Sequence, residues 1–216
     1  NFESFFANTA KLGFYAKTVL DVGAAGGTPA LHSAFPGADF FLFEPLKTFI
    51  PQLEELMKSY SGEIHNCALA SEEGERTIFV SADRYGSSLM HKIVGAEDER
   101  LETVKVRTLD EVFRNRDLQS PVLLKTDCQG GDFEVIKGAT ETLKKTEMII
   151  MEISFFQFWG SHHPKPLEIL NHLSDQGFVM YDILEGLHRP LDHALGQIDI
   201  VFVREDSELR SKQKWG

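Results

Sequence analysis

The sequence predicts an α/β fold with a mostly parallel sheet that helices cover on both faces. Short apolar runs alternate with amphipathic stretches along most of the 216 residues, and strands that alternate with helices form parallel sheets. The first apolar run ends in a Gly-rich turn at residues 23–27, which is typical of a tight connection from a strand to a helix. The last two apolar runs, 178–183 and 198–204, have no helical stretch between them, so they should pair antiparallel at one edge.

The order of the elements follows from the spacing of the apolar residues. Pro29 fits the first turn of a helix, and Gly177 comes just after the end of another. The predicted strands of the main sheet are residues 18–23, 39–43, 63–68, 121–127, 147–153, 178–183 and 198–204. The predicted helices are residues 28–35, 46–58, 109–115, 132–145 and 164–175.

An insert of different texture interrupts this alternation at about residues 75–107. Residues 75–80 and 103–107 alternate as exposed strands do, so we expect them to pair as a side ribbon around the polar, irregular residues 81–100. The length of the chain fits one domain. We therefore predict a single domain over residues 1–216 with a core at about 17–204 and a frayed, charged C-terminal end.

Composition and charge exclude several classes of function. The net charge is −11 and no basic stripe is visible, so nucleic acid and anionic membranes are not expected partners. No apolar run is long enough to span a bilayer, and none resembles a signal peptide. Cys67 and Cys128 stand far apart and form no zinc pattern. We expect free thiols, no bound metal and a cytoplasmic protein.

The turn from Asp21 to Gly27 predicts a cofactor site, because small residues let a ligand lie directly on the backbone. A dinucleotide site has the pattern G-x-G-x-x-G. Counted from Gly23, the matching positions are Gly23, Ala25 and Thr28, and only the first of them fits. The pattern D-x-G-x-x-x-G suits a ligand without a pyrophosphate, such as S-adenosylmethionine. The alternative is a Gly-rich turn that only makes a tight connection.

Glu44 supports the cofactor interpretation. It follows the second predicted strand, about twenty residues after the turn, and Pro45 comes next. From this position an acidic side chain accepts hydrogen bonds from ribose hydroxyl groups. The pair therefore predicts a nucleoside-containing cofactor with an unphosphorylated ribose.

A series of motifs then resembles one family. VLDVGAAGGT, LFEPL, NCALAS-x-x-GE, SSL, VRTLDEV, LLKTDCQGGDFEVIKGA and QIDIVFVR follow one another over roughly residues 17–204 in the order and spacing of the FkbM-like methyltransferases. The resemblance implies a class I methyltransferase fold, a Rossmann-like three-layer sandwich with a seven-stranded, mostly parallel sheet. It also implies S-adenosylmethionine as the cofactor and contact of the Ala68 backbone with adenine. Homo-oligomers are a further expectation.

The resemblance further implies methyl transfer, usually to a hydroxyl oxygen of a sugar, a glycan or another natural-product small molecule. Three positions depart from the family pattern. Ala25 stands where the family often has Asn, Gln129 stands where it usually has Glu, and Asp132 stands in for a later Glu. The change at Gln129 puts a metal or base role for that position in doubt.

The candidate catalytic residues are Asp127, Glu152 and His162. Asp127 ends a predicted strand beside the cofactor strand and could anchor the ammonium group of the cofactor, act as the general base, or cap the next helix. Lys125 shares its strand face by alternation, and a buried lysine needs a partner, so an ion pair is expected. Glu152 ends the next strand, where residues that face the acceptor are expected, with a capping role as the alternative. His162 suits an alcohol base, although an exposed His at a helix start is equally consistent with the sequence.

The candidate substrate residues lie in two loops. Phe155, Phe156, Phe158 and Trp159 follow the strand that carries Glu152 and could form the wall of an acceptor pocket or cover the sheet edge. His163 follows them. Ser87 and Ser88 lie in the insert, and the resemblance makes them candidates for the acceptor side.

Two alternative functions remain open at this point. A nucleotide-dependent dehydrogenase or epimerase commonly carries Tyr-x-x-x-Lys, but the fourth residues after Tyr15, Tyr60, Tyr85 and Tyr181 are Val19, Ile64, Leu89 and Glu185. The second alternative is a binding protein that keeps the fold and the cofactor without turnover, which the changed Gln129 suggests.

Overall fold

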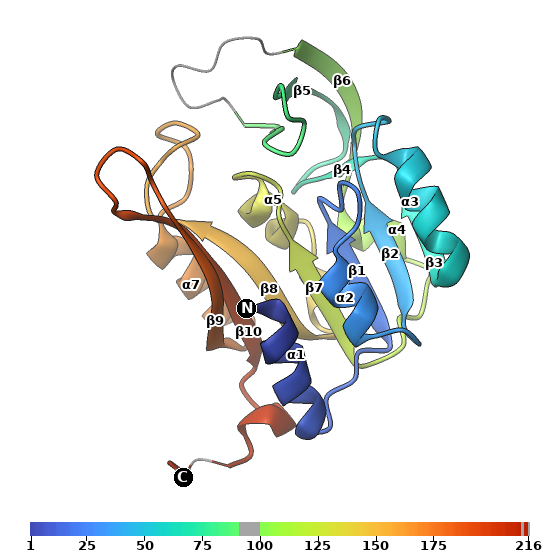
Figure 1. The fold of residues 1–216 in the computed structure, drawn as a ribbon, viewed down its shortest axis with the longest axis vertical. Helices are drawn as coiled ribbons and strands as arrows, with labels where there is room; N and C mark the ends of the chain where they lie inside the picture. Colours follow the sequence, from blue (N-terminus) through green and yellow to red (C-terminus); the bar gives the residue numbers. More distant parts are fainter. Residues whose placement is uncertain (91–99, 213, 216) are drawn as a thin grey trace.

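Seven strands form the main sheet in the computed structural model, which describes residues 1–90, 100–212, 214 and 215 (Figure 1). The strand order is β3-β2-β1-β7-β8-β10-β9. Every neighbouring pair is parallel except those of β10, which runs antiparallel to both β8 and β9. The strands are β1 (Thr18–Val22), β2 (Asp39–Phe43), β3 (Ser61–His65), β7 (Val122–Thr126), β8 (Thr146–Ser154), β9 (Phe178–His188) and β10 (Leu195–Arg204). This arrangement confirms the predicted mixed α/β sheet with an antiparallel edge.

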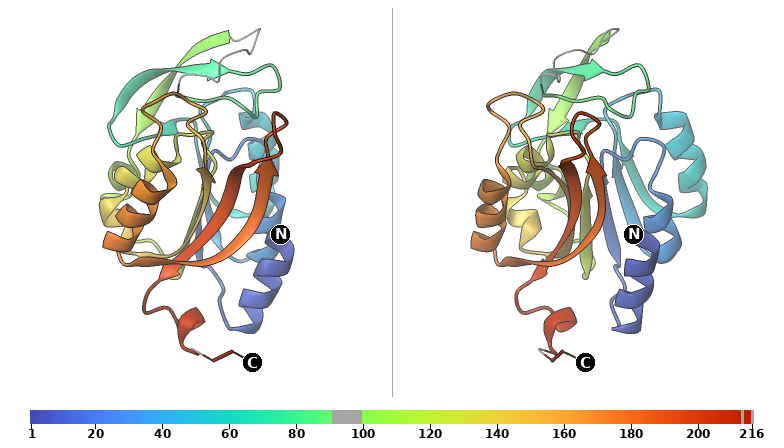
Figure 2. Two further views of the ribbon diagram at one scale, coloured as in Figure 1. Left: turned by 90° about the vertical axis from the view of Figure 1, so that its left-hand side faces the viewer. Right: turned by 60° about the vertical axis from the view of Figure 1, so that its left-hand side comes forward.

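Helices cover both faces of this sheet (Figures 1 and 2). Three of them pack on the face that carries Val19, Leu123 and Val201: α1 (Phe2–Lys11), α2 (Pro29–Ala34) and α3 (Ile50–Leu56). Four pack on the face that carries Leu20 and Leu124: α4 (Leu109–Phe113), α5 (Asp132–Lys137), α6 (Thr140–Leu143) and α7 (Pro166–Asp175). We call the first the α1 face and the second the α7 face. Strands buried on both sides explain the nearly continuous apolar runs in the sequence.

A second, three-stranded sheet lies over the carboxyl ends of β1 and β2 (Figure 1). Its order is β4-β6-β5, with β4 (Ala68–Leu69), β5 (Gly74–Val80) and β6 (Arg100–Arg107). The antiparallel pairing of β5 with β6 confirms the predicted side ribbon. An apolar cluster that includes Leu46, Phe49, Ile78 and Val106 joins this sheet to the segment after β2. Residues 91–99 of the predicted insert lie outside the described residues.

Several predicted boundaries were wrong. The strand predicted at 63–68 is two strands, because β3 ends at His65 and β4 starts the second sheet. The helix predicted at 132–145 is broken into α5 and α6 at Gly138. A Cβ at Gly138 would meet the carbonyl oxygen of Ala70 at 2.2 Å, so the chain turns there to let the two backbones approach.

The ends of the chain also differ from the prediction. Helix α1 was not predicted, although its start has a clear signal: the side chain of Asn1 accepts a hydrogen bond from the backbone N–H of Ser4. The C-terminal end was expected to fray, but Ser207 caps a short 3₁₀ helix, η2 (Glu208–Arg210). Another 3₁₀ turn, η1 (Met57–Ser59), extends α3, which itself starts at Ile50 instead of residue 46. Within the described part of the chain, no helix has the length and apolar character needed to cross a bilayer.

Candidate active site

The turn after β1 brings its backbone directly against the end of β7. Gly23 has a φ of +73°, and a Cβ there would lie 2.0 Å from the carbonyl oxygen of Asp127. Gly27 has a φ of +101°, and a Cβ would lie 2.6 Å from the Leu56 side chain. Both positions need glycine for their conformation, and at Gly23 the Asp127 backbone also leaves no room for a side chain. The two glycines are those of the predicted D-x-G-x-x-x-G pattern.

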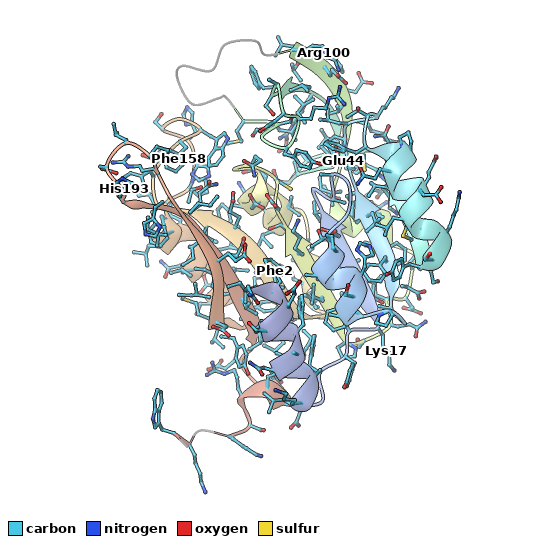
Figure 3. The ribbon with its side chains drawn as sticks, viewed as in Figure 1. Phe2, Lys17, Glu44, Arg100, Phe158 and His193 are labelled. Carbon is cyan, nitrogen blue, oxygen red and sulfur yellow. The ribbon has the colours of Figure 1, made fainter. Side chains whose placement is uncertain are left out.

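Glu44 fixes this turn to the loop that follows β2. The backbone N–H of Ala25 donates to Glu44 Oε2 at 2.9 Å, and that of Leu46 donates to Oε1 at 2.7 Å. Burial raises the pKa of the Glu44 carboxyl above its usual value, and the two backbone donors offset part of the rise. Figure 3 shows Glu44 between the main sheet and the second sheet. Each carboxylate oxygen has accepting capacity left beyond its one backbone partner.

A cavity opens at this point between the two sheets. Its polar walls come from the turn after β1, from Glu44 and from the segment after β7, and its apolar walls come from the segments after β2 and β3. The lining residues are Val22, Gly23, Ala25, Phe43, Glu44, Pro45, Leu46, Phe49, Cys67, Ala68, Leu69, Ile78, Arg84, Tyr85, Ser87, Leu89, Asp127, Cys128, Gln129 and Gly131. Six of the predicted cofactor residues therefore share one cavity: Gly23, Ala25, Glu44, Pro45, Ala68 and Asp127. Asp21 and Gly27 do not line it.

Asp21 lies beneath the cavity and is the partner of a buried lysine. Lys125 Nζ is 3.4 Å from Asp21 Oδ1 and 3.5 Å from Asp127 Oδ2. Asp21 is fully buried, whereas the side chain of Asp127 is 42% exposed. Burial alone would lower the pKa of Lys125, but the charges of Asp21 and Asp127 raise it above its usual value. The expected ion pair of Lys125 is confirmed.

The remaining carboxyl groups continue across the sheet from Asp127. Lys125 pairs with Ile150 in the parallel β7–β8 register, so Asp127 comes level with Glu152. Glu152 in turn pairs with Asp199 of β10, and Gln197 Nε2 donates to Glu152 Oε1 at 2.6 Å. We call Asp127, Glu152, Asp199 and Gln197 the polar row. It lies on the α1 face of the sheet, next to the cavity.

Burial and mutual repulsion perturb these acids. Burial, followed by the charges of Asp132, Asp127 and Asp199, raises the pKa of Glu152 to about 9. Burial and then Asp127 raise the pKa of Asp199 to about 6. The same two causes raise the pKa of Asp132, at the start of α5, to about 6. At neutral pH Glu152 is therefore protonated and able to donate a hydrogen bond, whereas Asp199 is mostly ionised.

Glu152 should make stability depend on pH. A carboxyl group whose pKa is raised on folding stabilises the protein fully below its unfolded pKa, and this contribution is lost as pH rises through the folded pKa. The free energy of unfolding should therefore fall between pH 4.5 and about 9. Glu152→Gln should flatten this decline in urea titrations across that range. Glu147→Gln, on the same strand, is the control; an unchanged decline in Glu152→Gln would contradict the shift.

The aromatic loop after β8 packs onto its surroundings instead of lining the cavity. A Cβ on Gly130 would lie 2.6 Å from the Trp159 ring, and Trp159 also lies against His163, with ring centroids 5.1 Å apart. A Cβ on Gly196 of the β9–β10 hairpin would lie 3.3 Å from the Phe158 ring, and Figure 3 shows Phe158 close to the tip of the hairpin that carries His193. These contacts attach the loop to the turn after β7 and to the hairpin.

The other predicted residues of this loop lie apart from the cavity. Phe155 is exposed, and Phe156 is covered by the guanidinium of Arg189, 3.8 Å from the ring centroid. His163 is buried, which lowers its pKa. His162 is exposed and lines a groove beside α5 and α7 with Phe133. This groove is on the α7 face, whereas the polar row is on the α1 face, so the structure does not bring His162 together with Asp127.

Residues 84–89 of the insert form a roof over the cavity. Ser88 is buried, its Oγ donates to the carbonyl oxygen of Gln129 at 2.6 Å, and Ser87 lines the cavity. Arg84 Nη1 donates to Thr48 Oγ1 at 2.7 Å. The Tyr85 ring lies over Phe49, with centroids 5.2 Å apart. Of the two serines predicted for the acceptor side, Ser87 lines the cavity, and Ser88 is bonded to the lining residue Gln129.

Ser88→Ala should loosen this roof. The substitution removes the bond to Gln129 and the bond that Met90 N donates to Ser88 Oγ at 3.0 Å. We expect the free energy of unfolding to fall by about 1–3 kcal/mol, because a buried backbone donor and acceptor lose their partner. Chemical denaturation measures this, with the exposed Ser33→Ala in α2 as the control. Equal stability of the two variants would show that the hydrogen bonds of Ser88 do not stabilise the fold.

The sequence did not single out Arg84, Tyr85, Gln197 and Asp199, which the structure places at the site. Arg84 and Tyr85 line the cavity, and Arg84 is the one cationic side chain among the described lining residues. Gln197 and Asp199 complete the polar row. The motif QIDIVFVR carries a signal for this pair, because strict alternation places Gln197 and Asp199 on one strand face and Ile198 and Ile200 on the other. Among the described residues, no three His, Cys, Asp or Glu side chains gather as metal ligands do.

The lining residues fit S-adenosylmethionine. Glu44 offers acceptors for ribose hydroxyl groups, and the apolar walls that include Phe49 and Ala68 suit adenine. The tight approach of Gly23 to Asp127 leaves the turn without a side chain at that point. Asp127 supplies an exposed carboxylate for a positively charged methionine end. Burial raises the pKa of the Cys128 thiol, so Cys128 lines the cavity as an uncharged thiol.

Comparison with known proteins agrees with the geometry. The chain is 26% identical over 133 residues to the hexuronic acid methyltransferase AglP of Haloferax volcanii, which covers 62% of this chain and 54% of that protein. The chain thus spans about half the length of this curated relative. Two solved structures share the fold. Magnesium protoporphyrin IX methyltransferase (ChlM) of Synechocystis PCC 6803, solved with bound S-adenosylmethionine, is 11% identical with a TM-score of 0.51 over 93% of this chain and 75% of that one. WbdD, solved with a kinase inhibitor, is 16% identical with a TM-score of 0.52 over 94% of this chain and 39% of that one.

The family model of the methyltransferase FkbM domain matches residues 21–180. This range is most of the chain and contains the cofactor turn, Glu44, the roof, Asp127 and Glu152. The chain therefore belongs to the FkbM methyltransferase domain family.

Proposed function

We propose that the protein transfers the methyl group of S-adenosylmethionine to a hydroxyl oxygen of a sugar or a related hydroxyl-rich small molecule. The observation that carries the proposal is the polar row beside the cofactor cavity, in which Asp127, Glu152 and Asp199 come level on three strands. Carboxyl and amide groups held in a row match the alternating donors and acceptors of a polyol. The relative that acts on a hexuronic acid supports the same class of acceptor.

One set of residues binds the cofactor, and a second set binds the acceptor. When bound, S-adenosylmethionine supplies a methyl group on a positively charged sulfur, which is open to attack by an oxygen nucleophile. The turn at Gly23 and the carboxylate of Glu44 hold the cofactor. The row next to Asp127 holds the acceptor, and a positioned acceptor at near-attack distance accounts for much of the rate of such a reaction.

An alcohol acceptor must lose its proton as it is methylated, and Asp199 is suited to take it. Its pKa of about 6 is close to neutral, where a general base is most effective. Glu152, with a pKa of about 9, keeps its proton and orients a hydroxyl by donating a hydrogen bond. Asp127 remains a second candidate for the base. His162 and His163 line the groove on the α7 face, so neither is proposed as a base for an acceptor held by the polar row.

The test is a methylation assay with labelled S-adenosylmethionine and a panel of neutral sugars, uronic acids, amines and phenols. We expect product from the sugars, and the new methyl group should survive alkaline hydrolysis, because an ether does and an ester does not. Asp199→Asn should reduce turnover, with the exposed Asp206→Asn as the control. Product formed only with amines, or only as alkali-labile esters, would contradict the proposal.

A further inference from the structure

The carboxylate of Asp127 is held from two sides. Gln129 Nε2 donates to Asp127 Oδ1 at 3.1 Å, and Lys125 Nζ lies 3.5 Å from Asp127 Oδ2. Within the described chain each oxygen thus has one such side-chain partner. Because Gln129 and Lys125 approach different oxygens, the Asp127 carboxylate is held in one orientation at the wall of the cavity.

Neither partner is free to move. Lys125 is buried, and its other neighbour is the fully buried Asp21 at 3.4 Å. Gln129 sits in a left-handed conformation with a φ of +48°. Its carbonyl oxygen accepts the bond from Ser88, and the next residue, Gly130, packs on Trp159. The roof and the aromatic loop thus hold the backbone from which the Gln129 amide reaches Asp127.

The formal charges of Asp21, Lys125 and Asp127 together leave one negative charge, which one cation can neutralise. Asp21 and Asp127 carry two negative charges and Lys125 carries one positive charge, so the sum is −1. Glutamine at position 129 leaves this sum unchanged. Glutamate there would make it −2 and would place two carboxylates within hydrogen-bonding distance of each other, where one of them is favoured to take up a proton.

We propose that Gln129 and Lys125 are positioning residues that hold Asp127 in place to receive the ammonium group of the cofactor's methionine end. A carboxylate that accepts from Gln129 on one oxygen and faces the charge of Lys125 on the other is arranged to attract a cation rather than to take a proton from an alcohol. A group positioned before the ligand arrives costs little ordering on binding. This inference concerns the methyl donor and stands whether or not the acceptor is a sugar.

The test compares two ligands that share adenine and ribose. S-adenosylhomocysteine carries the amino-acid end, and methylthioadenosine lacks it. Gln129→Met keeps the length of the side chain and removes the amide. We expect calorimetry to show about tenfold weaker binding of S-adenosylhomocysteine, since one hydrogen bond to a charged group is lost, and unchanged binding of methylthioadenosine. The control is Gln119→Met, because the Gln119 amide also faces a carboxylate, Asp39 Oδ2 at 3.4 Å, but at the amino ends of the strands.

A second variant keeps the inference falsifiable. Asp127→Asn removes the charge of the side chain without changing its shape. It should weaken the binding of S-adenosylhomocysteine at least as much as Gln129→Met does, and it should leave the binding of methylthioadenosine unchanged. Equal losses for both ligands in Gln129→Met would mean that Gln129 only supports the fold. Unchanged affinity for S-adenosylhomocysteine in Asp127→Asn, with reduced turnover, would assign Asp127 to the acceptor and overturn the inference. Failure of the sugar assay would leave these affinities as expected, so the two proposals fail separately.

Discussion

Gly23→Ala should abolish cofactor binding and destabilise the protein by roughly 2–5 kcal/mol. The backbone of Gly23 is in the left-handed region at a φ of +73°, which costs a residue with a side chain about 1–2 kcal/mol. The new methyl group would also lie 2.0 Å from the carbonyl oxygen of Asp127. Overpacking of this kind adds about 1–3 kcal/mol. Because the clash is with backbone at the end of β7, relief requires β1 and β7 to separate just where the cofactor should bind.

A second glycine separates the two causes. Gly13 has a φ of +88°, but a Cβ there would meet no atom within 4 Å. Gly13→Ala should therefore lose only the conformational part, about 1–2 kcal/mol, and should bind S-adenosylhomocysteine normally. Urea denaturation and calorimetry of the two variants provide the measurement. Equal destabilisation of both would show that the contact between Gly23 and Asp127 does not limit the site.

The architecture was accessible from the sequence because its signals are local. Strands β1 and β7 are buried along their whole length, so each appears as an apolar run, and glycines mark the turns that follow both strands. Elements whose bounds depend on distant contacts were predicted less well. Gly138 is the C-cap of α5 and lies against the Ala70 backbone. A glycine is a local signal for the end of a helix, but nothing near Gly138 in the sequence indicates Ala70 as its neighbour.

The cofactor side of the site was also largely predictable, whereas the acceptor side was not. Gly23 and Glu44 carry roles that spacing along the chain reveals. The polar row depends instead on register between strands: Asp199 comes opposite Glu152 only through the antiparallel pairing of β10 with β8. The aromatic loop shows the same limit. Its composition suggests a pocket wall, but Trp159 packs on Gly130 and Phe156 on Arg189. These contacts cannot be predicted from the local sequence.

Glu44→Ala should weaken binding of S-adenosylhomocysteine by about 2–4 kcal/mol. A hydrogen bond to a charged group contributes about 1.5–3 kcal/mol, and the substitution removes the proposed bonds to the ribose. It also leaves the backbone N–H groups of Ala25 and Leu46 without their present partner, so the turn itself loses its attachment to the loop after β2. The exposed Glu54→Ala in α3 is the control, and wild-type affinity in Glu44→Ala would mean that the ribose lies elsewhere.

The choice of ligand makes this prediction more specific. Methylthioadenosine keeps the ribose, so Glu44→Ala should weaken its binding as strongly as the binding of S-adenosylhomocysteine. Gln129→Met should affect only the ligand that carries the amino-acid end. If Glu44→Ala weakens the binding of both ligands and Gln129→Met weakens only that of S-adenosylhomocysteine, the ribose lies at Glu44 and the ammonium group at Asp127. These two contacts would then orient the cofactor along the cavity. The methyl group would then lie towards the polar row, because Asp127 is the residue that the cavity and the row share.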